Sequence, residues 1–125
     1  MSLLPLGAKI HLALGVTDMR KGLDGLAMLV QGVLRQDPFS GHLFLFRGRK
    51  AELLKILWWD GTGLCIFQKR LAKGRFASLW REDGAAARLT ASELALFIEG
   101  CELIGRRALS PEVVIAKPLV VDRAM

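Results

Sequence analysis

The sequence predicts one α+β domain, in which an antiparallel β-sheet of five or six strands packs against one long helix and a C-terminal helix. Short apolar runs separated by turn signals favour the strands. Two other stretches carry apolar residues at the three- and four-residue spacing of an amphipathic helix. A length of 125 residues is enough for one domain with its own core, which we place at residues 1–105, followed by a tail at 106–125.

The first expected elements are a half-buried strand and the long helix. Residues 8–14 alternate apolar and polar side chains, which is the two-residue period of a strand. Thr17 or Asp18 can then cap a helix that we expect over about residues 18–35, where apolar positions recur with helical spacing. The helix ends before Pro38, because the residue preceding a proline is pushed out of the α conformation.

The middle of the chain predicts an antiparallel meander. Its expected strands are short runs at residues 43–46, 53–59, 64–69, 75–80 and 86–89. The second and third runs flank Asp60-Gly61-Thr62-Gly63, in which glycine can take the positive φ of a tight turn. Glu82-Asp83-Gly84 is a further turn signal, so we expect the last run to pair back onto the one before it.

The C-terminal helix has a capping-box sequence at its start. Thr90 and Glu93 have the required spacing, and the apolar stripe that follows predicts a helix over about residues 91–104, with Gly105 at its end. The tail at 106–125 contains two prolines and two apolar runs. It could add an edge strand, bind a partner or remain mobile.

Composition argues against several classes of protein. Cys65 and Cys101 lack the paired spacing of metal ligands, so we expect two reduced core thiols, no metal and no cofactor. No apolar run approaches the roughly 18 residues that a membrane span needs, and the amino terminus lacks a signal sequence, so we expect a cytoplasmic protein without a membrane partner. An apolar fraction of 52% also suggests surface that is buried against another protein.

The positive charge is concentrated in one third of the chain. Residues 47–88 carry ten Lys and Arg against four Asp and Glu, a difference of +6 that equals the net charge of the whole chain. Such a field attracts polyanions, with nucleic acid, an acidic membrane surface and an acidic protein as alternatives to an ordinary solvated face. The residues that we expect to contact DNA are Arg47, Arg49, Lys50, Lys69, Arg70, Lys73 and Arg75.

Further contacts could come from aromatic and basic residues elsewhere. Trp58 and Trp59 point to opposite faces of the sheet, so one can be core while the other is available to stack on a base, although both can equally be buried. Arg20 and Lys21 fall in the first turn of the expected long helix, where they oppose the helix dipole, and pairing with nearby aspartates is the simpler account of them.

An enzymatic alternative is a metal-dependent nuclease. Asp37, Glu52 and Lys55 could surround a magnesium ion, but their spacing matches no strong nuclease signature. His11 and His42 show no paired ligand pattern. We therefore expect no catalytic residues.

Three ordered blocks carry a resemblance to a known family, namely residues 15–26 (GVTDMRKGLDGL), residues 37–44 (DPFSGHLF) and residues 55–61 (KILWWDG) continuing through Lys69-Arg70. Over about residues 8–105 the chain resembles the TnpB-type accessory protein of the insertion-sequence sixty-six group of bacterial transposable elements, which is not the RNA-guided nuclease that shares the TnpB label. One departure is that members usually continue from the basic hairpin into a Trp-Pro pair, whereas Trp80 is followed by Arg81.

The resemblance implies a small protein that is encoded beside a large DDE-type transposase and needed for transposition, without known catalytic chemistry of its own. Together with the localised charge, it predicts a non-catalytic accessory protein that binds DNA through the basic hairpin surface and assists the transposase of the same element. The alternative is a protein interaction module that contacts the transposase, or another copy of itself, without binding DNA.

Overall fold

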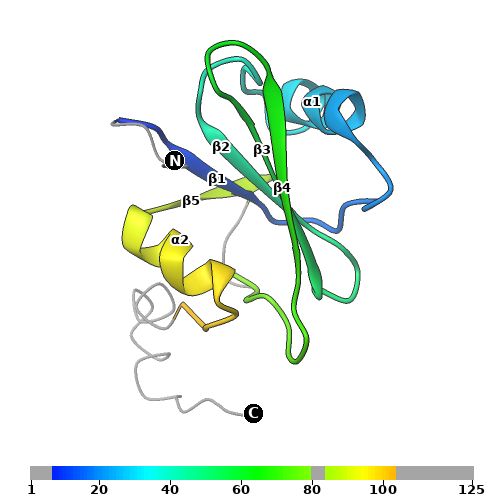
Figure 1. Cartoon of the computed structure of the whole chain (residues 1–125), viewed down its shortest axis with the longest axis vertical. Coiled ribbons are helices and arrows are strands. Elements are labelled where there is room, and N and C mark those ends of the chain that lie inside the picture. Colours follow the sequence, from blue (N-terminus) through cyan, green and yellow to red (C-terminus); the bar gives the residue numbers. More distant parts are fainter. Residues whose placement is uncertain (1–6, 80–83, 104–125) are drawn as a thin grey trace.

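The computed structural model describes residues 7–79 and 84–103 of the chain and shows five strands and two helices (Figure 1). The elements in chain order are β1 (Ile10–Ala13), α1 (Leu23–Gly32), β2 (Leu43–Arg47), β3 (Leu53–Trp59), β4 (Leu64–Arg70), β5 (Ala86–Leu89) and α2 (Ala91–Ile98). The expected α+β class is confirmed. Within the described part of the chain, no helix is long and apolar enough to cross a membrane.

The sheet is mixed, not purely antiparallel. Its strand order is β4-β3-β2-β1-β5, with β1 and β2 parallel and the other neighbours antiparallel. The expected meander is therefore wrong at two places: α1 returns the chain so that β2 runs alongside β1, and β5 pairs with the far side of β1. A helical crossover is the usual way to join parallel neighbours, because a tight turn can join only antiparallel ones.

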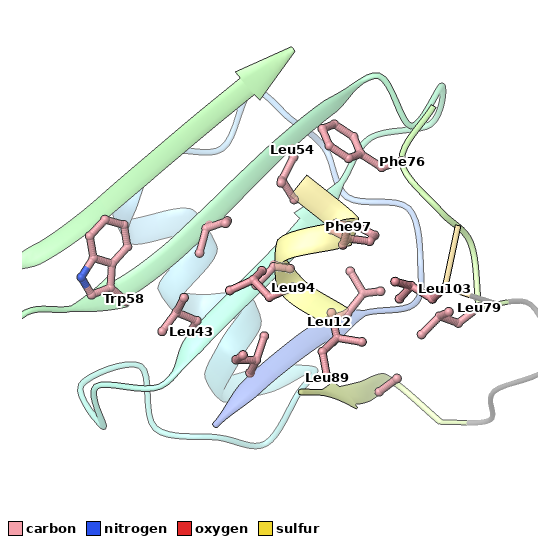
Figure 2. Close-up of a cluster of buried hydrophobic side chains, with 14 residues drawn as sticks. Leu12, Leu43, Leu54, Trp58, Phe76, Leu79, Leu89, Leu94, Phe97 and Leu103 are labelled. Carbon is pink, nitrogen blue, oxygen red and sulfur yellow. The ribbon is translucent and has the colours of Figure 1, made fainter. Parts of the chain in front are cut away.

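Each face of the sheet carries a hydrophobic cluster of its own. On one face Leu12, Leu54 and Trp58 pack with Leu94 and Phe97 of α2 (Figure 2). The two helices lie on opposite sides of the sheet (Figure 1). On the other face α1 contributes its buried side chains, and this cluster comprises Leu26, Val30, Leu34, Ala13, Phe44, Phe46 and Leu57. Since both faces are covered, β2 is buried along its whole length.

The long helix is shorter than the sequence predicts. It spans ten residues and is capped by the extended backbone of Gly22. Asp18 does not cap it, because its carboxylate accepts the backbone N–H of Arg20 at 3.0 Å in a local turn before the helix. At the other end the helix stops at Gly32, a residue of low helix propensity.

The C-terminal helix begins as the sequence predicts and ends early. Thr90 Oγ1 accepts the Glu93 N–H at 3.1 Å, and Glu93 Oε1 accepts the Thr90 N–H at 2.8 Å, so the capping box is confirmed. Gly100, at φ 83°, terminates the helix. The Cys101 N–H then reaches back to the Leu96 carbonyl at 3.0 Å. The expected end at Gly105 lies outside the described residues.

Two further expectations are wrong. Residues 75–79 form no strand; their backbone makes a single contact with the turn before β3, where the Phe76 N–H donates to the Ala51 carbonyl at 2.7 Å, and Phe76 and Leu79 enter the core beneath α2. Cys101 is exposed and only Cys65 is half-buried, although both are free thiols. Trp80 and the tail at 106–125 lie outside the described residues.

Candidate nucleic-acid interface

Two chain segments that are distant in the sequence lie side by side at one end of the sheet. They are the turn between β2 and β3, at residues 48–52, and the segment after β4, at residues 71–76 (Figure 1). The Leu71 N–H donates to the Glu52 carbonyl at 2.9 Å and the Phe76 N–H donates to the Ala51 carbonyl at 2.7 Å, so two backbone hydrogen bonds join the segments. We call these two segments, together with Arg70 at the end of β4, the basic end, because they present five exposed cationic side chains, those of Arg49, Lys50, Arg70, Lys73 and Arg75.

Tight backbone geometry holds the first of these segments in place. The Ala51 N–H donates to the Gly48 carbonyl at 3.0 Å, and Ala51 adopts φ 56°, which is unusual for a residue other than glycine. A Cβ at Gly48 would meet Met19 Cγ at 2.6 Å, so the turn packs directly against the chain before α1. The two cations at the tip of this turn are therefore presented by a fixed loop.

The charge of the basic end is not neutralised by the neighbouring described residues. No ion pair joins any of its five side chains to an acidic residue within 7–79 or 84–103. Glu52 is half-buried and is the acidic residue of these two segments. A locally uncompensated positive field of this kind attracts polyanions.

Two of the seven expected DNA-contacting residues use their side chains inside the fold. Arg47 is only 6% exposed, and its guanidinium donates to the carbonyls of Ala77 and Leu14, the latter at 3.3 Å. Burial lowers the pKa of Arg47 from its ordinary value. Lys69 Nζ donates to the Ile98 carbonyl at 2.9 Å, at the C-terminal end of α2, where a cation is favourable.

The two candidate tryptophans lie away from the basic end. Trp58 and Trp59 point to opposite faces, as the sequence predicts, but Trp58 is 7% exposed in the cluster beneath α2. Trp59 is half-buried and meets Phe39 edge to face, with ring centroids 5.5 Å apart. Both tryptophans close β3 beside the hairpin turn, whereas the basic end adjoins the first residue of that strand. Neither tryptophan ring is therefore placed to stack on a base at the basic end.

Arg20 and Lys21 precede α1 and serve local contacts. Arg20 forms an ion pair with Asp18, with Nη2 2.8 Å from Oδ2, and these hydrogen bonds lower the pKa of the Asp18 carboxyl. The Lys21 carbonyl accepts Nζ of the buried Lys55 at 2.8 Å. Lys55 lies inside β3 between apolar neighbours, and that position is the sequence signal that it is buried, whereas Arg47 ends β2 beside a basic turn and carries no such signal.

Asp37 and Glu52, the acidic residues considered for a nuclease, lie in turns, as does Asp60. Asp37 accepts the Phe39 N–H at 2.9 Å, and Asp60 accepts the N–H groups of Thr62 and Gly63 at 2.9 and 3.0 Å. Among the residues that the structure describes, no group of three or more His, Cys, Asp or Glu side chains could hold a metal ion.

The buried His11 stacks with the half-buried His42, a pair that the sequence does not indicate. The His11 ring stacks with those of His42 and Phe44, whose centroids are 5.6 and 5.0 Å away. Burial lowers the pKa of His11 to about 4, helped by the charges of Arg88, His42 and Lys9. Nε2 of His11 and Nδ1 of His42 have no hydrogen-bond partner in the described part of the chain.

Comparison with known proteins places the chain among proteins of an insertion sequence. A family model described as IS66 Orf2-like protein matches residues 8–108. The uncharacterized protein y4hO of Sinorhizobium fredii is 44% identical over 102 residues, which cover 80% of this chain and 88% of that protein. The uncharacterized protein y4jC of the same organism is 33% identical over 96 residues, which cover 77% of this chain and 81% of that protein. No solved structure matches the chain.

Proposed function

The chain belongs to the IS66 Orf2-like protein family, and from this premise we propose that it is a non-catalytic accessory protein for transposition of an insertion sequence, which binds DNA through the basic end and assists the transposase of the same element. The observation that supports the DNA-binding part is a group of five exposed cations. Four lie on two segments that the fold brings together, and the fifth is Arg70 at the adjoining end of β4.

The chemistry of the basic end suits phosphates better than bases. Lysine and arginine displace counterions from the DNA backbone, and this term needs no particular sequence. Phe76, the aromatic residue of the two segments, is 2% exposed and packs against Phe97 in the core. We therefore infer backbone contacts that depend weakly on sequence, with any recognition of specific sites left to the transposase.

A salt series tests DNA binding quantitatively. Five phosphate contacts predict that the logarithm of the association constant falls with the logarithm of the salt concentration with a slope of about −4.5 on duplex DNA. Affinity for a duplex of arbitrary sequence then drops about 500-fold between about 50 and about 200 mM salt. Absent binding, or binding that salt does not weaken, contradicts the proposal.

Two variants of equal net charge separate the contribution of the basic end to DNA binding from the contribution of the net charge of the chain. Changing Arg49, Lys50, Lys73 and Arg75 together to alanine leaves one of the five cations, so we expect the slope to fall to about −0.9. The matched control, which changes Lys9, Arg20, Lys21 and Arg35 to alanine, removes the same charge elsewhere and keeps the slope. Equal effects of the two variants would show that binding follows net charge alone.

A second function is favoured by the apolar surface on the α1 side. Met28, Val33 and Phe39 are 70%, 54% and 51% exposed, so a partner protein that covers them would bury large apolar side chains. In this alternative the chain is an interaction module that contacts the transposase and never DNA. Co-purification with the transposase that survives nuclease treatment and the loss of the basic end, with no DNA binding by the chain alone, would favour it.

A further inference from the structure

The second segment of the basic end, residues 71–76, is fixed at both of its ends. Leu71 and Phe76 donate their backbone N–H groups to carbonyls of the turn before β3, at 2.9 and 2.7 Å. The exposed Lys73 and Arg75 lie between these two hydrogen bonds. Two cations of the basic end are therefore presented on a short loop whose ends are both held.

The C-terminal end of α2 packs against the same part of the chain. Nζ of Lys69 donates to the Ile98 carbonyl at 2.9 Å, and because Ile98 closes α2 this carbonyl has no partner within the helix. Phe76 stacks with Phe97, with ring centroids 5.5 Å apart (Figure 2). Contacts with α2 thus lie on both sides of Lys73 in the sequence.

A glycine lets the chain that leaves α2 lie directly on Leu71. Gly100 adopts φ 83°, and a Cβ at this position would meet Leu71 Cδ1 at 3.3 Å, which is a tight contact. The position of residues 71–76 therefore depends on α2 as well as on the turn before β3.

A set of cations that is fixed before binding favours one class of DNA. Duplex phosphates form a regular array, whereas a single strand is flexible and is commonly held by bases that stack on exposed rings. Phe76, the aromatic residue of the two segments, is only 2% exposed. Cations that are already in place also avoid much of the entropy cost of ordering them on the DNA.

Given the proposed binding of DNA, on which this inference rests, we propose that the basic end binds duplex DNA in preference to single strands and that Lys69 is a positioning residue for this site. Lys69 holds residues 71–76 against α2 and contacts no phosphate itself. Loss of its ammonium group leaves all five exposed cations of the basic end in the chain but fixes two of them, Lys73 and Arg75, less firmly.

Lys69→Met distinguishes positioning from direct contact with DNA. The variant keeps the apolar stem and loses the donor to Ile98, so we expect duplex affinity to fall about tenfold, as for the ordering of two long side chains, while the salt slope stays at about −4.5. Affinity for a single strand of the same length is expected to stay at the wild-type value, since a flexible strand adjusts to either arrangement. The matched control Lys73→Met also removes one charge, but it removes a phosphate contact and lowers the slope to about −3.6.

Gly100→Ala displaces the segment without changing the charge. Its methyl group presses on Leu71, so we expect duplex affinity to fall as in K69M while single-strand affinity stays the same. Gly61→Ala is the control, because Gly61 is at φ 107° but a Cβ there meets nothing within 4 Å. G61A strains the hairpin turn at the other end of β4 and is expected to keep duplex affinity. Circular dichroism shows that all four variants are folded.

Four results overturn the proposal. They are a K69M chain whose salt slope falls as that of K73M does, K69M and G100A chains that keep wild-type duplex affinity, variants that lose affinity for both forms of DNA equally, and a wild-type chain that binds single strands as tightly as the duplex. Absence of salt-dependent binding to either form is a different result, because it removes the proposed function and the positioning role of Lys69 together.

Discussion

Replacing Arg47 by methionine removes a buried guanidinium while keeping much of its volume. In the fold this group donates to the carbonyl of Ala77, in the segment after β4, and to the carbonyls of Ala13 and Leu14 at the end of β1, at 3.5 and 3.3 Å. It thereby ties three separate parts of the chain together. The side chain is 6% exposed, so water cannot replace these bonds in the variant.

The expected loss of stability in R47M follows from two opposing free-energy terms. A hydrogen bond to a charged donor contributes about 1.5–3 kcal/mol, and the bond to Ala13 is long enough to count for little. The two remaining hydrogen bonds are opposed by the free-energy cost of burying the guanidinium charge. Burial also lowers the pKa of Arg47, and the methionine variant no longer carries this cost. We expect R47M to lower the free energy of unfolding by about 2–4 kcal/mol.

Urea unfolding measures this change, and Arg49→Met is the matched control. Arg49 lies two residues further along the chain and is exposed, so R49M is expected to change stability by less than about 0.5 kcal/mol and to weaken DNA binding instead. R47M is expected to keep the salt dependence of DNA binding under conditions where it is folded. Unchanged stability of R47M together with reduced DNA affinity would refute the structural role of Arg47.

Two other predictions concern the histidine stack and α2. His11 has its pKa lowered from 6.5 to about 4 in the fold, so the unfolded chain binds the extra proton between these values and stability falls as the pH drops from about 6.5 to about 4. The loss of unfolding free energy that is attributable to His11 is about 1–3 kcal/mol, and the lower figure allows for solvent screening. Urea unfolding of the wild-type and His11→Phe chains across this pH range isolates the contribution of His11. A His11→Phe chain whose stability has the wild-type pH dependence would contradict the prediction. Thr90→Ala removes the hydroxyl that accepts the Glu93 N–H at 3.1 Å and is expected to cost about 1 kcal/mol, measured as a lower melting temperature, whereas Thr90→Ser retains the cap and the stability.

Local features of the fold were predictable because a few neighbouring residues encode them. The hairpin turn depends on the Asp60 carboxylate and on Gly61 at φ 107°, and the start of α2 depends on the Thr90 and Glu93 pair. The concentration of cations between residues 47 and 88 is likewise a property of the chain itself. Helix ends were less predictable, because Asp18 was taken by a local turn and Gly100 stopped α2 early.

The candidate site was predictable only as a set of residues and not as a surface. Nothing adjacent in the sequence states that Arg47 turns inward to the Ala77 carbonyl or that Lys69 reaches the end of α2, since both acceptors lie about thirty residues away. The five cations that remain outside are grouped because Leu71 and Phe76 bond back to the turn before β3.

The sequence by itself predicted the five strands that the structure shows, although it also predicted a strand at residues 75–79 that does not form. It likewise determined the capped second helix, the hairpin and the position of the positive charge along the chain, since each depends on contacts within a few residues. Only the tertiary structure decided that β1 lies between β2 and β5, and which cations face solvent. The physical reason is that strand pairing and side-chain burial are settled by the free energy of filling both faces of one sheet, a quantity shared among residues far apart in the chain.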